Sequence, residues 1–119
     1  MVAEERRANG RDDPWKVRYW GVGNENWGCG GNMRPEYYAD LYRRFSVYCR
    51  DYEDNKLFKV ACGANSFDYR WTEVMMREAG RFMDGLSLHY YVETRWGEDA
   101  KPIRATEVDE ASWFEFLYR

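Results

Sequence analysis

The sequence predicts an α/β fold in which three parallel strands alternate with helices. Short apolar runs of strand length are separated by longer stretches whose apolar residues recur every three or four positions, as on one face of a helix. The links between these segments are short, which is typical of successive βαβ units. These two observations fit a sector of a closed barrel and a doubly wound open sheet equally well.

The first elements are a short helix and a strand. Residues 2–10 have the character of the last turns of a helix, because Asn9-Gly10 is a favourable C-terminal signal. The first strand is expected over residues 16–22, where a glycine-rich loop begins.

A long amphipathic helix should follow the loop. Pro35 suits its first turn. Its apolar residues recur at intervals of three and four and define one face. That predicted face consists of Tyr38, Leu41, Tyr42, Phe45, Cys49 and Tyr52.

The second predicted strand and the helix after it each end at a glycine. A strand is expected over residues 57–62 and ends at Gly63, and a helix over residues 71–79 ends at Gly80. A third strand is expected over residues 83–91.

The remaining C-terminal residues are predicted to begin with a loop and to end with a helix. Residues 93–104 are polar and predicted to form a long loop, and residues 109–118 are predicted to form an amphipathic helix.

Composition and charge narrow the possible functions. The 119 residues are 45% hydrophobic and 33% charged with a net charge of −3, which argues against disorder and gives no electrostatic reason for nucleic acid or anionic membrane as a partner. No apolar run approaches the roughly 20 residues that span a bilayer. The three cysteines lack C-x-x-C spacing, so neither a disulfide framework nor a zinc site is indicated, and the cytoplasm is the expected location.

Residues 19–31 form the most informative stretch, because they set one carboxylate, Glu25, where an apolar strand breaks into a loop of glycines and aromatic residues. Desolvation beside Trp27 is expected to raise the pKa of Glu25 toward the range of a general acid. The Asn24 amide can hydrogen-bond a sugar hydroxyl. The Trp27 ring suits the apolar face of a sugar, although it can equally pin the loop. These residues make Glu25 a candidate catalytic carboxylate in surroundings that suit a sugar, with an ordinary loop glutamate as the alternative.

The same residues allow other interpretations. A dinucleotide-binding loop is disfavoured because the third glycine of G-x-G-x-x-G falls at Asn26. Cys29 has no histidine nearby in sequence to activate it as a nucleophile. His89, the only histidine, can be a hydrogen-bonded residue at a strand end, and no local motif supports a metal role for it. A carbohydrate-binding protein without catalysis stays open as the alternative function.

Four segments, residues 19–31, 35–44, 61–63 and 84–91, resemble in the same order the family 51 glycoside hydrolases, the α-L-arabinofuranosidases. The resemblance implies a sector of a (β/α)8 TIM barrel with about three of its strands. Members of that family are several times longer and carry a separate β-sandwich. Residues 1–119 are therefore expected to be a partial catalytic domain that lacks the β-sandwich, and the full-length parent is expected to be a homo-oligomer.

The resemblance also implies the chemistry. Glu25 would be the acid/base of a retaining enzyme that removes terminal α-L-arabinofuranosyl groups from arabinan or arabinoxylan fragments without a metal or organic cofactor. Asn24 would hold a sugar hydroxyl, while His89 and Tyr91 would line the site, with Tyr91 bonding the nucleophile.

The nucleophile of that family is not recognised in this sequence. Its Asp-Glu-Trp-Gly type motif is missing. The pair Asp109-Glu110 has the character of a helix N-cap and a first-turn acid instead. The nucleophile is expected to lie beyond the C-terminus.

Overall fold

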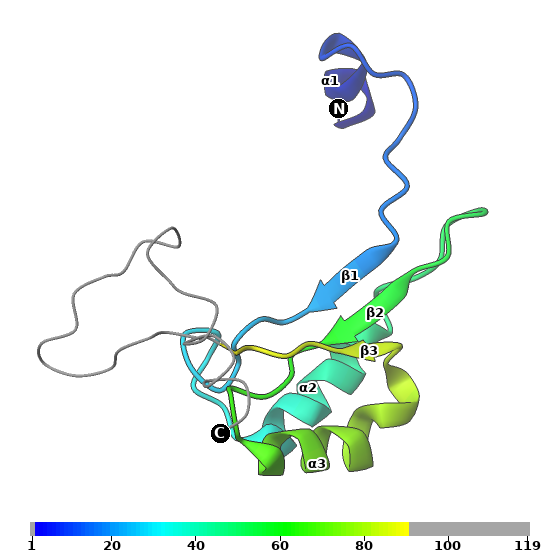
Figure 1. Ribbon diagram of the computed structural model, residues 1–119. Helices are drawn as coiled ribbons and strands as arrows, with labels where there is room; N and C mark the ends of the chain where they lie inside the picture. The colour runs from blue at the N-terminus through cyan, green and yellow to red at the C-terminus, as the bar shows by residue number, and fades with distance from the viewer. Residues whose placement is uncertain (1, 91–119) are drawn as a thin grey trace, which may run out of the picture. The chain divides into compact units, whose positions relative to one another are not determined.

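The computed structural model describes residues 2–90, and the residues up to His89 form the first of the two units into which the chain divides. The elements of the first unit, shown in Figure 1, are α1 (Val2–Ala8), β1 (Tyr19–Val22), α2 (Pro35–Ser46), β2 (Phe58–Ala61), α3 (Tyr69–Ala79), the 3-10 helix η1 (Gly80–Phe82) and β3 (Gly85–Leu86). The predicted loop over residues 93–104, the predicted helix over residues 109–118 and Tyr91 lie outside the described residues.

The three strands form one parallel sheet in the order β1-β2-β3, which confirms the predicted parallel α/β arrangement for the described residues. Both longer helices, α2 and α3, lie on the same face of this sheet (Figure 1). Each helix thus connects two neighbouring parallel strands, as in a βαβ unit.

The register of the sheet decides which strand residues face the helices. Val22 lies beside Ala61, and Ala61 lies beside Leu86. Ala61 belongs to the buried core, and the other two pack against it. Because successive side chains of a strand point to opposite faces, the adjacent row faces away from the helices. That row is Gly21, Val60 and Gly85.

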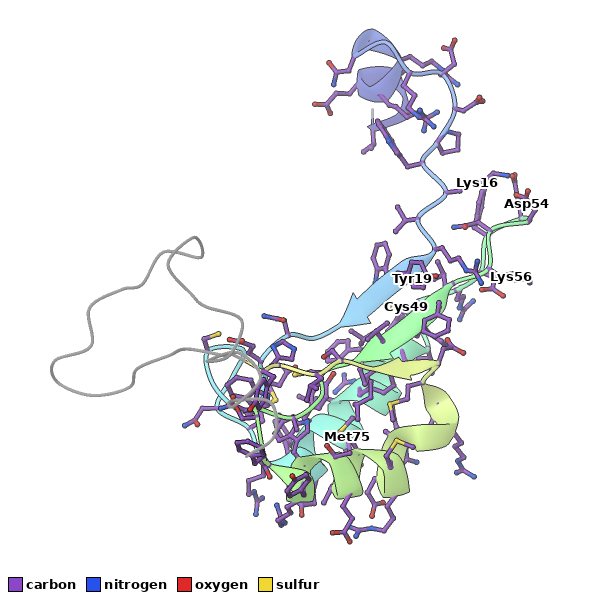
Figure 2. All side chains as sticks on the ribbon, in the orientation of Figure 1. Lys16, Tyr19, Cys49, Asp54, Lys56 and Met75 are labelled. Atoms are coloured by element: carbon purple, nitrogen blue, oxygen red, sulfur yellow. The ribbon has the colours of Figure 1, made fainter. Side chains whose placement is uncertain are left out.

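The core between the sheet and the two helices is built around aromatic side chains. Trp71 and Tyr42 are both 1% exposed, and Met75 of α3, labelled in Figure 2, is fully buried. The ring of Tyr38 stacks on that of Trp71 with 5.6 Å between centroids. Burial of such large apolar groups is the main source of stability in a small α/β unit.

Two core side chains also hold the ends of the strands in place. The Tyr38 hydroxyl donates to the Val22 carbonyl at 2.6 Å and accepts the Cys62 N–H at 2.7 Å. The Trp71 indole N–H donates to the Cys62 carbonyl at 2.9 Å. Helices α2 and α3 therefore fix the C-terminal ends of β1 and β2, from which the next loops begin.

The predicted second helix is too long. Helix α2 ends at Ser46, whereas its predicted face continued to Cys49 and Tyr52. Beyond a turn, Tyr52 pairs with Asn55 as an antiparallel bridge and is 71% exposed. Local backbone pairing competes with the helix here, so the spacing of Cys49 and Tyr52 is coincidental.

The predicted first and third strands are also too long. The side-chain amide of Asn55 donates to the Val17 carbonyl at 2.9 Å. Regular backbone pairing of β1 with β2 therefore begins only after Val17. Strand β3 is limited to Gly85–Leu86, although an isolated parallel bridge joins Asn65 to His89 farther on. Figure 2 shows Lys16 beside Asp54, to which its ammonium group is bonded at 2.5 Å.

Candidate active site

The loop after β1 is a compact coil of backbone hydrogen bonds. The Glu25 carbonyl accepts the N–H groups of Gly28 at 2.8 Å and Gly30 at 2.9 Å, and the Asn26 carbonyl accepts that of Met33 at 2.7 Å. A Cβ at Gly30 would lie 1.8 Å from the Asn24 carbonyl oxygen, so only glycine fits there. The glycines of this loop therefore allow a tight turn of the backbone.

Glu25 occupies an uncommon backbone conformation. Its φ is +46°, in the left-handed region that few residues other than glycine adopt. The coil of hydrogen bonds around its carbonyl holds it there, and this conformation sets the direction of the side chain. Strain of this kind at a polar residue is a pointer to function.

Both oxygens of the Glu25 carboxylate accept hydrogen bonds. Cys29, four residues on, donates from Sγ to Oε2 at 3.1 Å. His89, from the segment after β3, places Nδ1 at 3.2 Å from Oε1. The side chains of Glu25 and His89 are only 21% and 17% exposed. The segments after β1 and β3 therefore bring these two side chains together.

A chain of hydrogen bonds continues behind His89. The Ser87 hydroxyl lies 3.0 Å from His89 Nε2 and accepts the N–H of Gly63 at 3.0 Å. Since Oγ accepts from Gly63, its own hydrogen can go to Nε2, which leaves Nδ1 as the protonated nitrogen facing the carboxylate. In this arrangement His89 donates from Nδ1 to Glu25.

The expected rise in the pKa of Glu25 is wrong for the described part of the chain. The hydrogen bond from Cys29, and then that from His89, lower the pKa of this carboxyl below its usual value and outweigh desolvation, which acts in the opposite direction. Hydrogen bonds to the charged form favour it. The carboxylate also raises the pKa of the Cys29 thiol, chiefly through the same hydrogen bond.

Trp27 fixes the loop and also flanks the site. Its indole N–H donates to the Gly63 carbonyl at 3.0 Å, which ties the loop after β1 to the end of β2. Its ring meets the His89 ring edge to face, with centroids 5.9 Å apart. Trp27 remains partly exposed beside His89, so a role in holding the loop does not prevent one in contacting a sugar.

The two asparagines that flank Glu25 differ. Asn24 is exposed and makes no side-chain hydrogen bond within residues 2–90, so its amide is available to a ligand. Asn26 is buried and donates from Nδ2 to the Gly30 carbonyl at 3.0 Å, which is a structural role.

Sequence reasoning missed Ser87 and Cys29 as parts of the site. Ser87 lies two residues before His89, and this spacing places both side chains on one face of an extended segment. Cys29 lies four residues after Glu25 within a coiled loop, where no simple periodicity relates side chains.

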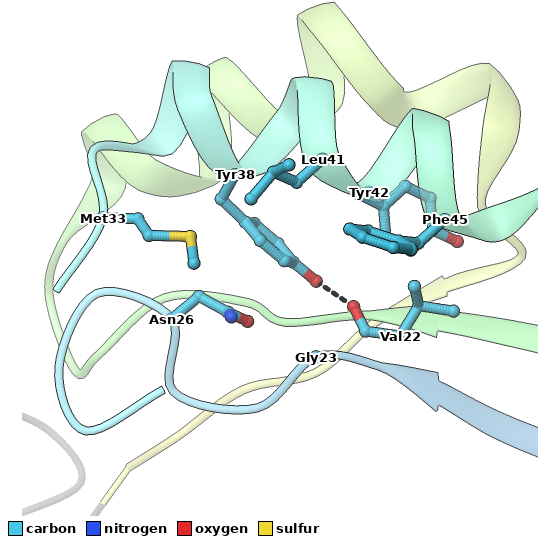
Figure 3. Close-up of a pocket in the computed structure, with 8 residues that line it drawn as sticks. All are labelled: Val22, Gly23, Asn26, Met33, Tyr38, Leu41, Tyr42 and Phe45. Atoms are coloured by element: carbon cyan, nitrogen blue, oxygen red, sulfur yellow. Dashed lines mark hydrogen bonds between the residues drawn. The ribbon is translucent and has the colours of Figure 1, made fainter. Parts of the chain in front are cut away.

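An apolar pocket of about 190 Å³ lies beside the site, between α2 and the end of β1 (Figure 3). Val22, Tyr38, Leu41 and Phe45 are among its lining residues. Glu25 is not among them, so this pocket is separate from the carboxylate. Within residues 2–90 there is also no cluster of three or more His, Cys, Asp or Glu side chains arranged to hold a metal ion.

None of the helices between residues 2 and 90 has the length and apolar character that spanning a bilayer requires.

Comparisons with known proteins point to one family. The family model of the alpha-L-arabinofuranosidase 1 domain matches residues 1–107. An intracellular exo-alpha-L-arabinofuranosidase from Bacteroides ovatus is 57% identical over 112 residues, which are 94% of this chain and 22% of that protein. An intracellular exo-alpha-(1->5)-L-arabinofuranosidase from Streptomyces lividans is 29% identical and is matched over 96% of this chain and 18% of its own length.

A solved structure shows the same fold. The crystal structure of the GH51 arabinofuranosidase from Xanthomonas axonopodis pv. citri matches with a TM-score of 0.77 and 53% identity, over 98% of this chain and 23% of that one. The chain thus spans about a fifth of the length of these relatives. With its family model, its relatives and its fold in agreement, the chain belongs to the α-L-arabinofuranosidase family of glycoside hydrolases.

Proposed function

We propose that this chain is part of the catalytic domain of a retaining α-L-arabinofuranosidase and that Glu25 is its general acid/base. The observation that carries the proposal is the carboxylate of Glu25 at the end of β1, hydrogen-bonded to His89 beyond β3 and flanked by Trp27. A carboxyl group held between strand ends, next to an indole and a free amide, suits a sugar whose glycosidic oxygen must be protonated.

The architecture proposed for residues 1–119 is a sector of a (β/α)8 barrel. Three parallel strands with both helices on one face support it, because helices form the outer layer of such barrels. The row of Gly21, Val60 and Gly85 would face the interior. Active sites of these barrels lie at the C-terminal ends of the strands, where Glu25 and His89 lie. The β-sandwich would be a separate domain outside this chain.

In the proposed mechanism, Glu25 first protonates the leaving oxygen and then deprotonates the attacking water. A second carboxylate about 5 Å away attacks the anomeric carbon, as in retaining enzymes generally. Within the described residues the groups that perturb Glu25 are Cys29 and His89, with no second carboxylate among them. We place the nucleophile outside residues 2–90, with Tyr91 as its hydrogen-bond partner.

The remaining roles follow from the same proposal. Asn24 would bond a hydroxyl of the arabinofuranosyl ring, while Trp27 and His89 would form one wall. The substrates would be arabinan or arabinoxylan oligosaccharides, and the reaction would need no cofactor. The names of the relatives support an intracellular, cytoplasmic location and an arabinose-containing substrate. The full-length protein would be a homo-oligomer without nucleic acid or membrane partners.

The test is the dependence of the Glu25→Gln defect on the leaving group, measured in the complete enzyme that carries this chain. On arabino-oligosaccharides kcat/KM should fall by roughly 10²- to 10⁴-fold, the usual contribution of a general acid. On p-nitrophenyl α-L-arabinofuranoside the loss should be much smaller in the glycosylation step, because p-nitrophenolate leaves with little protonation. Glu73→Gln, on the exposed side of α3, is the matched control.

Equal losses on both substrates would contradict the acid role and point to Glu25 as nucleophile or structural residue. No loss on either would remove Glu25 from catalysis.

A second candidate is a catalytically inactive carbohydrate-binding fragment. The observation that favours it is that the described site contains Glu25 without a paired carboxylate. Calorimetry of the 119-residue chain with an arabino-oligosaccharide, combined with mass spectrometry of the sugar, tests it. Binding that Trp27→Ala abolishes, with no hydrolysis, would support this function for the isolated chain, whereas product formation would exclude it.

A further inference from the structure

We propose that Cys29 is a positioning residue for the acid/base and that the carboxyl group of Glu25 exchanges its catalytic proton at Oε2, the oxygen next to Cys29. The catalytic consequence rests on the proposed function, whereas the control of the carboxyl group by Cys29 rests on the geometry alone. The two carboxylate oxygens differ in the donors that hold them.

Oε1 is held by a side chain that is itself hydrogen-bonded to a neighbouring residue. His89 reaches it at 3.2 Å, and Nε2 of the same ring is bonded to Ser87. Ser87 in turn accepts the N–H of Gly63, a buried residue at the end of β2 whose Cβ, if present, would lie 1.5 Å from the Ser87 carbonyl oxygen. A ring fixed at both nitrogens keeps its donor on Oε1, so this oxygen is a poor place for a proton.

Oε2 accepts a hydrogen bond from a donor that can rotate away. The thiol of Cys29 is a weak donor, its side chain is exposed, and it lies in the coiled loop that contains Glu25 itself. When Oε2 takes a proton, the thiol hydrogen can turn toward solvent or the sulfur can accept the new O–H. The corresponding change at His89 would require its proton to move from Nδ1 to Nε2 and the Ser87 hydroxyl to turn as well.

Both proton transfers of the reaction then take place at one oxygen, Oε2. In the first step the proton on Oε2 goes to the glycosidic oxygen, whose bond to the anomeric carbon breaks and leaves its electron pair on that oxygen. A carboxylate nucleophile forms the new bond to carbon. In the second step water attacks the same carbon, the bond to the nucleophile breaks, and the proton lost by water returns to Oε2.

The charged and titratable surroundings agree with control by Cys29. The titratable groups that act on Glu25 in the described part of the chain are the Cys29 thiol and the His89 imidazole, and Glu25 in turn influences the buried Cys62 thiol. The hydrogen bond from Cys29 is the largest influence that lowers the pKa of Glu25. Removing this donor should therefore let Glu25 hold its proton to higher pH.

The experiment compares Cys29→Ala, which removes the donor, with Cys29→Ser, which keeps a donor of similar length. Cys49→Ala is the matched control, because the Cys49 sulfur contacts the Phe45 carbonyl and not Glu25. The Glu25 carboxyl is titrated by ¹³C NMR in the 119-residue chain, with its signal identified by its loss in Glu25→Gln. The alkaline limb of the pH profile of kcat/KM is measured in the complete enzyme.

The expected result is an upward shift of the Glu25 titration midpoint and of the alkaline limb in Cys29→Ala, with little shift in Cys29→Ser and none in Cys49→Ala. Unshifted values in Cys29→Ala, or equal shifts in Cys29→Ser, would overturn the proposal. If a variant chain does not fold, the pH profile of the complete enzyme decides between these outcomes.

The assignment of Oε2 has its own test. Methylthiolation of the Cys29 sulfur places a methyl group beside Oε2 and removes its donor. The modified enzyme should lose at least ten-fold in kcat/KM on oligosaccharides, while Cys29→Ser treated in the same way should not. Full activity after modification of Cys29 would assign the proton to Oε1.

The experiments can contradict the acid/base role of Glu25 and the positioning role of Cys29 separately. If the midpoint of Glu25 shifts in Cys29→Ala but the pH profile of the enzyme does not, Cys29 controls the carboxyl group and Glu25 is not the acid/base. If neither moves although Glu25→Gln shows the defect of a lost acid, the proposed function stands and the role of Cys29 is wrong.

Discussion

Tyr38 shows how a single hydroxyl connects the core to the site. It is 2% exposed, and its oxygen bonds to Val22 at the end of β1 and to Cys62 after β2. Cys62 is 1% exposed, so water cannot replace the hydroxyl as the partner of its N–H. A buried polar group that loses its partner costs more than the hydrogen bond itself contributes.

We therefore expect Tyr38→Phe to lower the free energy of unfolding by about 1–3 kcal/mol, since it leaves the Cys62 N–H and the Val22 carbonyl without this partner. Urea unfolding followed by tryptophan fluorescence measures the change. Tyr42→Phe is the matched control, because its hydroxyl lies at a longer 3.4 Å from the Phe82 carbonyl. That control should lose less than about 1 kcal/mol. A loss in Tyr38→Phe no greater than in the control would contradict this role.

Among the secondary-structure elements, the close approach of the segments after β2 and β3 determines the shape of the site. Gly63 lies against the Ser87 backbone, and its own N–H and carbonyl bond to Ser87 and Trp27. A single residue without a side chain thus lets the loops after β1, β2 and β3 meet. This contact sets the position of His89 relative to Glu25.

Gly63→Ala should destabilise the chain by about 3 kcal/mol or more, at the upper end of the usual cost of overpacking, because its Cβ would meet backbone and not a movable side chain. Thermal unfolding by circular dichroism measures this cost. Gly28→Ala serves as the control, since a Cβ there would meet its nearest atom, the Glu25 carbonyl oxygen, at an ordinary 3.9 Å. Equal stability of the two variants would show that the loops after β2 and β3 can move apart at little cost.

For the whole molecule, the buried tyrosines predict loss of stability at alkaline pH. Burial raises the pKa of Tyr42 to about 12 and that of Tyr38 still further. An unfolded tyrosine ionises near about pH 10. Above that pH the unfolded chain has lost protons that the folded chain retains, so the free energy of unfolding decreases as pH rises.

The stabilisation from these two groups should be fully present below about pH 10 and should be lost progressively as the pH rises through about 12. Urea unfolding at a series of alkaline pH values measures it. Tyr42→Phe should make the decrease less steep, whereas Tyr48→Phe, which changes a tyrosine that is 70% exposed, serves as the control. An unchanged slope in Tyr42→Phe would contradict the assignment.

The order of strands and helices was predictable from the sequence because it depends on local patterns. Periodicity identified α2, α3 and the three strands, and Gly10, Gly63 and Gly80 marked where segments end. The ends of α2 and β1 were predicted wrongly. Tyr52 pairs with Asn55, and the Asn55 side chain donates to the Val17 carbonyl. No spacing within one segment reveals such pairing.

The sequence by itself determined the α/β class and the family resemblance, and it indicated Glu25, Trp27 and His89 as candidate site residues, because each depends on residue types in a local context. Only the tertiary structure decided which side chains of the candidate site contact one another. Glu25 and His89 are 64 residues apart in sequence, and their contact depends on the register of three strands. The direction of the pKa shift of Glu25 was decided there too, since hydrogen bonds from Cys29 and His89 outweigh the desolvation that the aromatic neighbours suggested.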